Sequence, residues 1–159
     1  MPVTLDMLRS WRDPRGVIRA KLADGPREDR ALATVMGACA LIFVSQWPRL
    51  SREAFLQPEV PLEARMVGAL MGVVFLLPLF LYAVAALSHL VARLFGGKGT
   101  WFSARLALFW ALLSVAPLML LNGLVAGFLG QGAALTAVGI AVAAGFLYLW
   151  INMLIEAER

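Results

Sequence analysis

Side chains that commonly carry catalysis or bind metals are scarce in this sequence. It contains a single histidine, His89, and a single cysteine, Cys39. A histidine-based zinc protease motif needs two histidines, and a disulfide or redox pair needs two cysteines, so neither can be built within the chain. A serine activated by His89 would have to be Ser45, Ser88 or Ser114, and none lies in a Gly-x-Ser-x-Gly motif. The sequence therefore predicts a non-enzymatic protein without a metal or another cofactor.

The glycine-rich segment Gly96-Gly97-Lys98-Gly99-Thr100 is a second candidate for chemistry, because glycine-rich loops can bind phosphate groups. A nucleotide-binding P-loop ends in Gly-Lys followed directly by serine or threonine. In this sequence Lys98 is followed by Gly99. The pattern favours a tight connector between two membrane helices, with Lys98 facing lipid headgroups.

Three polar residues in or near the uncharged stretches could act inside a membrane. His89 precedes Arg93 by about 6 Å of helix, so we expect it near the inner lipid headgroups, where it forms a hydrogen bond. A proton relay is the alternative role for His89. Asn122 and Asn152 are predicted to form interhelical hydrogen bonds worth about 1 kcal/mol each. Alternatively, these intramembrane polar residues line a route for a solute.

The composition indicates which elements must position these residues. Of the 159 residues, 61% are hydrophobic and 15% are charged, and mean hydropathy is +0.80. A soluble domain has about 45–50% apolar and about 25% charged residues. This composition excludes a soluble enzyme, an ordinary nucleic-acid binder and a disordered tail. The net charge of +4 is better explained by anionic lipid than by nucleic acid.

Uncharged runs predict an all-α fold, a polytopic transmembrane helical bundle with four spans. A span needs about 20 mostly apolar residues. The predicted spans are residues 31–48, 66–93, 106–129 and 133–155, which together form a transmembrane domain over 31–155. The first should stop at Pro48, the second should kink at Pro78, and a glycine turn over 130–132 should separate the last two. A break at Asn122-Gly123 is the competing position, but it would leave a short third helix.

The distribution of basic residues predicts the orientation. The amino-terminal segment, the 93–105 loop and the carboxyl end would share one side and hold eleven lysine or arginine residues, against three on the other. Because basic residues are retained in the cytoplasm, we expect both termini there, in an inner membrane. The 49–65 segment would be a proline-containing connector on the outer side. A signal peptide is the competing interpretation of the first run, but about 30 largely polar residues precede it.

Residues 1–30 are predicted to be a cytoplasmic tail containing a short amphipathic helix. Asp13 and Pro14 form a helix-start signal, a capping side chain followed by proline in the first turn. Apolar residues fall on one face, and the cations Arg15, Arg19 and Lys21 occupy the rest. We expect this helix to lie on the lipid surface with those cations facing headgroups. The alternative is a helix packed against the cytoplasmic face of the protein itself.

Small residues recur at four-residue spacing in the predicted spans, which lets helix backbones approach closely. These residues are Gly68 and Gly72 in the second span, Gly123 and Gly127 in the third, and Ala137, Ala141 and Gly145 in the fourth. Packing within the chain is the simplest use of such faces. An interface with a second copy or with a larger membrane protein assembly is the alternative.

The segment from Leu94 to Phe102, together with residues 104–108 and Pro117, resembles the bacterial branch of the Yip domain family, whose eukaryotic members interact with Ypt/Rab GTPases. The resemblance implies an integral membrane protein with a cytoplasmic amino terminus and no known catalytic residues. In eukaryotic members it implies roles in vesicle trafficking and membrane shaping. Eukaryotic relatives are usually drawn with five spans, whereas four are expected here. Their Asp-Leu-Tyr-Gly-Pro type motif is absent from residues 1–30, so GTPase binding is not transferred.

Two functional hypotheses follow, besides the intramembrane enzyme that the scarcity of catalytic groups disfavours. The first is a scaffold, accessory subunit or membrane-organising factor that works through helix packing, with the lipid bilayer and membrane proteins as partners and no nucleic acid. The second is a small transporter or channel for an uncharged or lipid solute.

Overall fold

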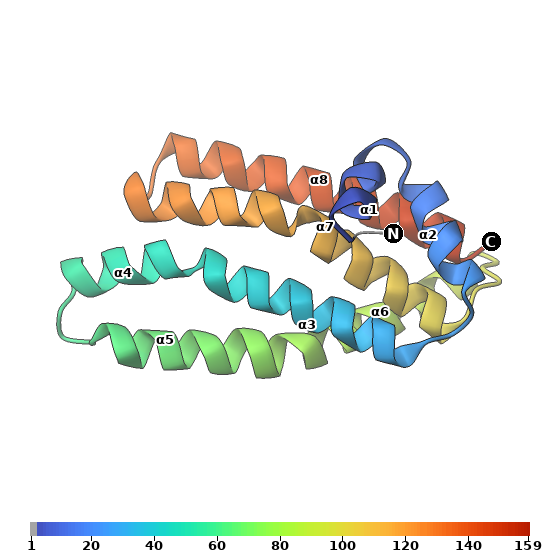
Figure 1. The fold of residues 1–159 in the computed structure, drawn as a ribbon, viewed down its shortest axis with the longest axis horizontal. Helices are drawn as coiled ribbons and strands as arrows, with labels where there is room; N and C mark the ends of the chain where they lie inside the picture. Colours follow the sequence, from blue (N-terminus) through green and yellow to red (C-terminus); the bar gives the residue numbers. More distant parts are fainter. Residues whose placement is uncertain (1–2) are drawn as a thin grey trace.

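The computed structural model describes residues 3–159, and all its regular elements are helices (Figure 1). In chain order they are α1 (Val3–Arg12), α2 (Pro14–Ala23), α3 (Glu28–Ser45), α4 (Trp47–Leu56), α5 (Leu62–Leu70), the π-helix η1 (Met71–Leu76), α6 (Leu77–Leu94), α7 (Trp101–Phe128) and α8 (Ala133–Ala157). Four helical segments are long and apolar enough to span a membrane, namely Glu28–Leu56, Leu62–Leu94, Trp101–Phe128 and Ala133–Ala157. The predicted four-span helical fold is confirmed.

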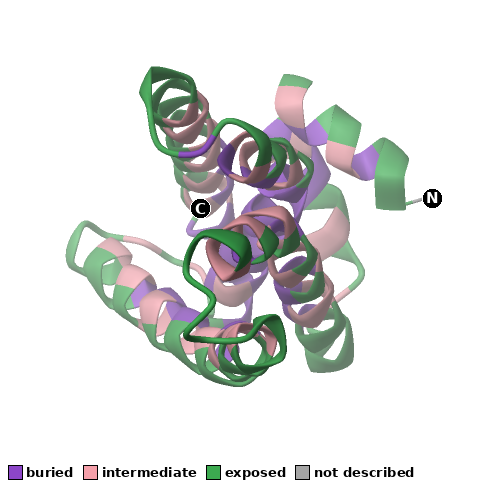
Figure 2. Cartoon of the chain, turned by 90° about the vertical axis from the view of Figure 1, so that its left-hand side faces the viewer, coloured by how far each residue is buried: buried purple, intermediate pink, exposed green. Residues whose placement is uncertain are grey.

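Helix α7 is the central element of the bundle. It packs against α3, α4, α6 and α8, and the small helix α1 also contacts it. In the 18-residue apolar stretch that could span a membrane, 56% of the α7 residues are buried inside the protein, compared with 6% of the α8 residues. Because α7 is apolar on every side, it can be surrounded by protein over its first half, up to Pro117. Figure 2 shows the buried residues gathered where the helices face one another, with exposed residues on the outer surfaces.

The first span does not end where the sequence indicated. Helix α3 ends at Ser45, but α4 begins at Trp47 and continues to Leu56, with Pro48 in its first turn. Proline is tolerated there because the first N–H groups of a helix have no intrahelical acceptor. The segment 49–65, expected to be a connector, is therefore mostly helical, and only Gln57–Pro61 separate α4 from α5.

Pro78 distorts the second span, as predicted, through a π-helical turn. Proline lacks an N–H and its ring crowds the carbonyl four residues earlier. The helix widens in the preceding residues, and the Leu77 N–H donates to the carbonyl of Gly72, five residues back. Such single π-helical turns occur inside otherwise α-helical segments.

The turn between α7 and α8 falls at the predicted glycines. Gly130 and Gly132 have φ angles of +73° and +156°, which favour glycine. Arg52 from α4 donates hydrogen bonds of 3.4 Å to the carbonyls of Gly127 and Phe128 and so caps the end of α7.

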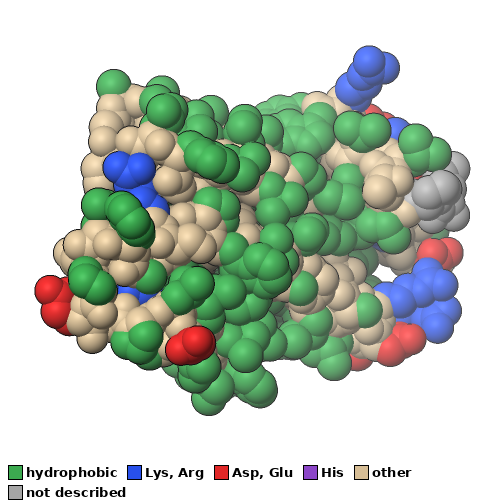
Figure 3. Space-filling model, turned by 60° about the vertical axis from the view of Figure 1, so that its left-hand side comes forward, with side chains coloured by type: hydrophobic (Ala, Val, Ile, Leu, Met, Phe, Trp, Pro, Cys, Tyr) green, Lys and Arg blue, Asp and Glu red, His purple; other side chains and the backbone are tan. Residues whose placement is uncertain are grey.

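The charged residues gather at the two ends of the molecule. Figure 3 shows a hydrophobic belt between two charged regions. We call the end formed by α1, α2, residues 95–100 and the last residues the terminal end, because both chain ends lie there (Figure 1). The opposite end carries Gln57–Pro61 and the glycine turn, and we call it the distal end. The arrangement is that of a multi-pass membrane protein.

Candidate functional site

The polar groups that the bundle positions most specifically lie at its terminal end. Helix α2 begins as predicted, because the Asp13 carboxylate accepts a 2.9 Å hydrogen bond from the Gly16 N–H and Pro14 occupies the first turn. A Cβ on Gly16 would lie 1.9 Å from the Asp13 carboxylate oxygen Oδ2, so a larger residue at position 16 would require the capping side chain to shift. Val17 and Ile18 of α2 are buried in the core.

The three cations predicted to face lipid headgroups also contact protein groups, and their contact with lipid stays a prediction. The Arg15 Nε atom donates to the Asn152 Oδ1 atom over 3.2 Å, and Arg19 forms a 2.7 Å ion pair with Glu156. The hydrogen bond with Glu156 also raises the pKa of the Arg19 guanidinium. Lys21 pairs with an aspartate of α1, as described below. These contacts, together with the packing of α2 against α8, favour the alternative in which the helix lies on the protein itself.

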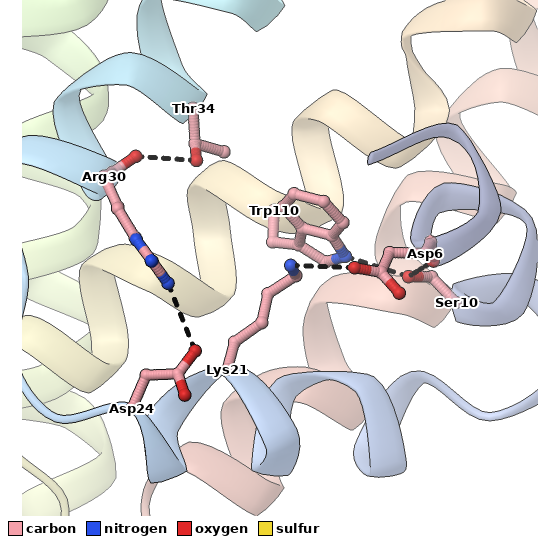
Figure 4. A network of polar contacts seen from close by, with 7 residues as sticks. All are labelled: Asp6, Ser10, Lys21, Asp24, Arg30, Thr34 and Trp110. Atoms are coloured by element: carbon pink, nitrogen blue, oxygen red, sulfur yellow. Dashed lines mark hydrogen bonds and ion pairs between the residues drawn. The ribbon is translucent and has the colours of Figure 1, made fainter. Parts of the chain in front are cut away.

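A polar network joins α1 and α2 to the central helix (Figure 4). The Trp110 indole N–H donates to the Ser10 hydroxyl over 2.9 Å, and that hydroxyl donates to the Asp6 carbonyl over 2.7 Å. The Lys21 ammonium lies 3.2 Å from the Asp6 carboxylate and 3.9 Å from the centre of the Trp110 ring. A cation over an indole face is attracted by the ring quadrupole. The sequence analysis did not identify this network, in which the hydrogen bond between Trp110 and Ser10 joins residues 100 positions apart.

A cavity of about 520 Å³ opens beside this network, between α1, α2, α3 and α7. Its charged lining residues are Asp6, Arg9, Lys21, Asp24, Arg27 and Arg30. Phe102, Leu106 and Trp110 of α7 form an apolar wall. Arg30 and Asp24 pair across its rim over 3.1 Å (Figure 4). We call it the terminal cavity.

His89 forms a hydrogen bond, and its partner is near the carboxyl end of the chain. Its Nδ1 atom lies 2.7 Å from the Glu158 carboxylate, and the two residues are only 1% and 7% exposed. The Trp101 ring lies against the imidazole, with the ring centres 4.5 Å apart. A buried carboxylate is costly unless it is paired, so this contact compensates for the burial of Glu158.

The glycine-rich loop closes around the same glutamate. The Lys98 N–H donates to the Glu158 carbonyl over 2.7 Å, and the Gly99 N–H donates to its carboxylate over 3.3 Å. A Cβ on Gly99 would lie 2.3 Å from the Ala157 carbonyl oxygen, and one on Gly97 would lie 2.8 Å from the Glu158 carboxylate. Glycine is therefore required for this close approach. We call His89, Gly97, Gly99 and Glu158 the C-terminal latch.

Two of the predicted small-residue faces, those of the third and fourth spans, pack against other parts of the same chain. A Cβ on Gly123 would lie 1.8 Å from the Ser45 carbonyl oxygen, and one on Gly127 would lie 2.2 Å from Pro48. Gly145 of α8 receives the ring of Trp11, 2.7 Å from where a Cβ would be. Helix backbones and an aromatic ring thus fill these faces.

In the described structure, no other helix packs closely against the glycines of the second span. Among residues 3–159, no atom other than those of the local helix backbone lies within 4 Å of a Cβ placed on Gly68 or Gly72. Ala141 of α8 is likewise exposed. These positions face outward from the bundle, so any partner for them must come from outside the chain.

The two asparagines lie in separate environments. Asn152 accepts from Arg15 and donates to the Tyr148 carbonyl over 2.7 Å. The Asn122 Oδ1 atom is buried, has no hydrogen-bond partner among residues 3–159, and is 3.9 Å from a Cβ placed on Gly139. Gly139 and Asn152 are about 20 Å apart along α8. The structure does not bring the asparagines together, and their use in a permeation route stays a prediction.

These features define a class. Four long apolar helices, charged groups at both ends and a helical cap at one end describe a polytopic helical membrane protein. Among the described residues 3–159, no cluster of three or more histidine, cysteine, aspartate or glutamate side chains could hold a metal ion.

The sequence matches the Yip1 domain over residues 8–158, which is nearly the whole chain, and the protein therefore belongs to this family. The predicted family resemblance is confirmed, whereas assignment to a bacterial branch stays a prediction. Proteins of this family are generally non-enzymatic membrane proteins. No curated protein and no solved structure matches the chain.

Proposed function

We propose that this protein is a non-enzymatic scaffold of the cytoplasmic (inner) membrane that associates with a second copy of itself through the open face formed by α5 and η1. The observation that carries this proposal is the contrast among its small-residue faces. Gly123, Gly127 and Gly145 are filled by the chain itself, whereas Gly68 and Gly72 meet open space within the described structure.

The chemistry of the open face suits helix association in lipid. Lipid tails are as apolar as leucine side chains, so membrane helices associate through close packing rather than through a hydrophobic driving force. Glycines four residues apart remove the side chains that would hold two backbones apart. The neighbouring Val67 and Met71 are large, apolar and exposed, so they can pack beside the glycines.

A pair of substitutions tests this interface. In the variant Gly68→Leu with Gly72→Leu, we expect energy transfer between donor- and acceptor-labelled copies in liposomes to fall to the level of a non-interacting membrane protein. The matched control is Gly37→Leu in α3, because a Cβ on Gly37 also meets no atom within 4 Å among the described residues. Unchanged association in the double variant, or no association of the wild-type protein at any density, would contradict the proposal.

The proposed orientation has both termini in the cytoplasm. Its support is the distribution of basic residues, with eleven on the side of the terminal end and three on the other side. Lysine and arginine near the ends of spans are retained on the cytoplasmic side.

A further inference from the structure

More cations than acids line the terminal cavity. Four cations and two acids line it, and two of the pairings are Lys21 with Asp6 and Arg30 with Asp24. Arg27 contacts Asp29, which is outside the cavity lining. Its volume of about 520 Å³ lies within the range of small-molecule sites. The site therefore suits an anionic group of moderate size.

The arginines at the rim retain donors for such a group. Arg27 and Arg30 each form one ion pair that uses a single guanidinium nitrogen, Nη2 in Arg27 and Nη1 in Arg30. A guanidinium carries five N–H donors, and its planar fork matches the oxygens of a phosphate. Both side chains are about half exposed, so they can reorient toward a ligand in the cavity.

The charged and apolar lining residues come from different elements: α7 contributes only Phe102, Leu106 and Trp110, and the charged residues come from α1, α2, the segment after α2 and α3. Asp24, Arg27 and Arg30 lie at the start of α3 and the residues before it, whereas Trp110 lies about 14 Å along α7 from its first residue. Phe102 and Leu106 occupy the helical turns between. A ligand that fits this lining has an anionic part and an apolar part, which distinguishes a lipid from free phosphate.

One side of the cavity is formed by helix α1, which has the features of a helix that lies at a lipid surface. Helix α1 contributes Val3, Asp6 and Arg9 to the cavity, and its Leu5 and Leu8 side chains are 53% and 68% exposed. Large apolar side chains on one face of a short amphipathic helix are typical of helices in the interfacial plane of a bilayer. The cavity is therefore adjacent to the headgroups of one leaflet.

We infer that the terminal cavity binds an anionic glycerophospholipid from this leaflet. The phosphate lies against Arg27 and Arg30, and the glycerol and first acyl carbons lie against Phe102 and Leu106. Lys21 remains over Trp110 and supplies further positive charge to the headgroup. This inference uses no residue of the open face of α5 and η1 and does not depend on self-association.

Lipid titration by native mass spectrometry of the full chain in detergent tests the inference. We expect phosphatidylglycerol to bind about tenfold more tightly than phosphatidylcholine, and Arg27→Gln with Arg30→Gln to remove that preference. Ala33→Phe should also weaken phosphatidylglycerol binding, because it fills the cavity without changing its charge. The matched control is Arg12→Gln with Arg93→Gln, which removes the same charge outside the cavity lining.

Each remaining outcome has a defined meaning. Equal loss in the control and cavity variants would overturn the inference, because it would show general attraction to a basic surface. Equal binding of the two lipids, or phosphatidylglycerol binding that survives Ala33→Phe, would also overturn it. Competition by inorganic phosphate at concentrations equal to those of the lipid would identify a phosphate site rather than a lipid site. Size-exclusion profiles and circular dichroism equal to the wild type establish that the variants are folded.

Discussion

At the residue scale, Glu158 is an acidic side chain in a buried environment. It is almost fully buried, and it is held by the His89 ring and by the N–H of Gly99. The sequence indicated a hydrogen bond for His89 but could not identify its partner. Glu158 lies among charged residues at the end of α8, where a solvent-exposed side chain is the usual expectation.

The first prediction concerns the latch. Substituting His89→Ala should lower the free energy of unfolding by about 1–3 kcal/mol, because the Glu158 carboxylate oxygen Oε1 is left buried without the hydrogen bond that it makes with His89. Reversible unfolding in mixed detergent micelles measures this change. The control is Ser88→Ala, whose hydroxyl donates to the Ala85 carbonyl of its own helix. An equally small effect of both substitutions would show that the latch does not stabilise the fold.

At the element scale, the glycines show how the same residue type serves different purposes. Gly123 lies against the Ser45 backbone, whereas Gly68 meets no such neighbour within the described structure. The four-residue spacing of glycines predicted close packing for both faces. It could not predict which face is used within the chain, because that depends on how the helices are arranged around α7.

The second prediction compares these glycines directly. Gly123→Ala should lower the free energy of unfolding by about 1–3 kcal/mol, since its methyl group must displace the Ser45 carbonyl. Gly68→Ala should raise it by up to about 1 kcal/mol, since alanine is the better helix former and the space is open. Unfolding at low protein-to-detergent ratio keeps both variants monomeric. A stabilising Gly123→Ala would contradict the packing of α7 on the α3–α4 junction.

Helix boundaries were predictable where the signal is local. The Asp13 cap and the glycine turn after α7 follow from the geometry of a few adjacent residues, and the structure has both. Pro48 shows the limit of this reasoning. Proline ends one helix and is equally suited to the first turn of the next, and only the packing of α4 against α7 decides that the segment continues.

At the scale of the whole molecule, the two ends differ in charge. The hydropathy of the sequence was enough to predict four spans, because burial in hydrocarbon imposes a length and a composition that are visible in any window. The packing of α1 and α2 on the bundle was not predictable in the same way. Their amphipathic pattern fits a lipid surface and a protein surface equally well.

The third prediction concerns orientation. In a Cys39→Ala background, a membrane-impermeant thiol reagent applied to intact cells should label Glu59→Cys in the distal loop and leave Lys98→Cys unlabelled. Both side chains are exposed in the structure. Labelling of Lys98→Cys in permeabilised cells is the control for reactivity. The reverse pattern would place the termini outside the cytoplasm.

The contacts of α8 determine when the amino-terminal helices can reach their final positions during synthesis. Trp11 lies against Gly145, Arg19 pairs with Glu156, and the loop before α7 closes on Glu158. Helices α1 and α2 therefore bind a surface of α8 that is synthesised much later, since Arg19 and Glu156 are 137 residues apart. Their docking on α8 must wait for the synthesis of that helix, and a ribosome stalled before residue 145 would leave three complete spans, with the contacts of α1 and α2 to the end of α8 still unmade.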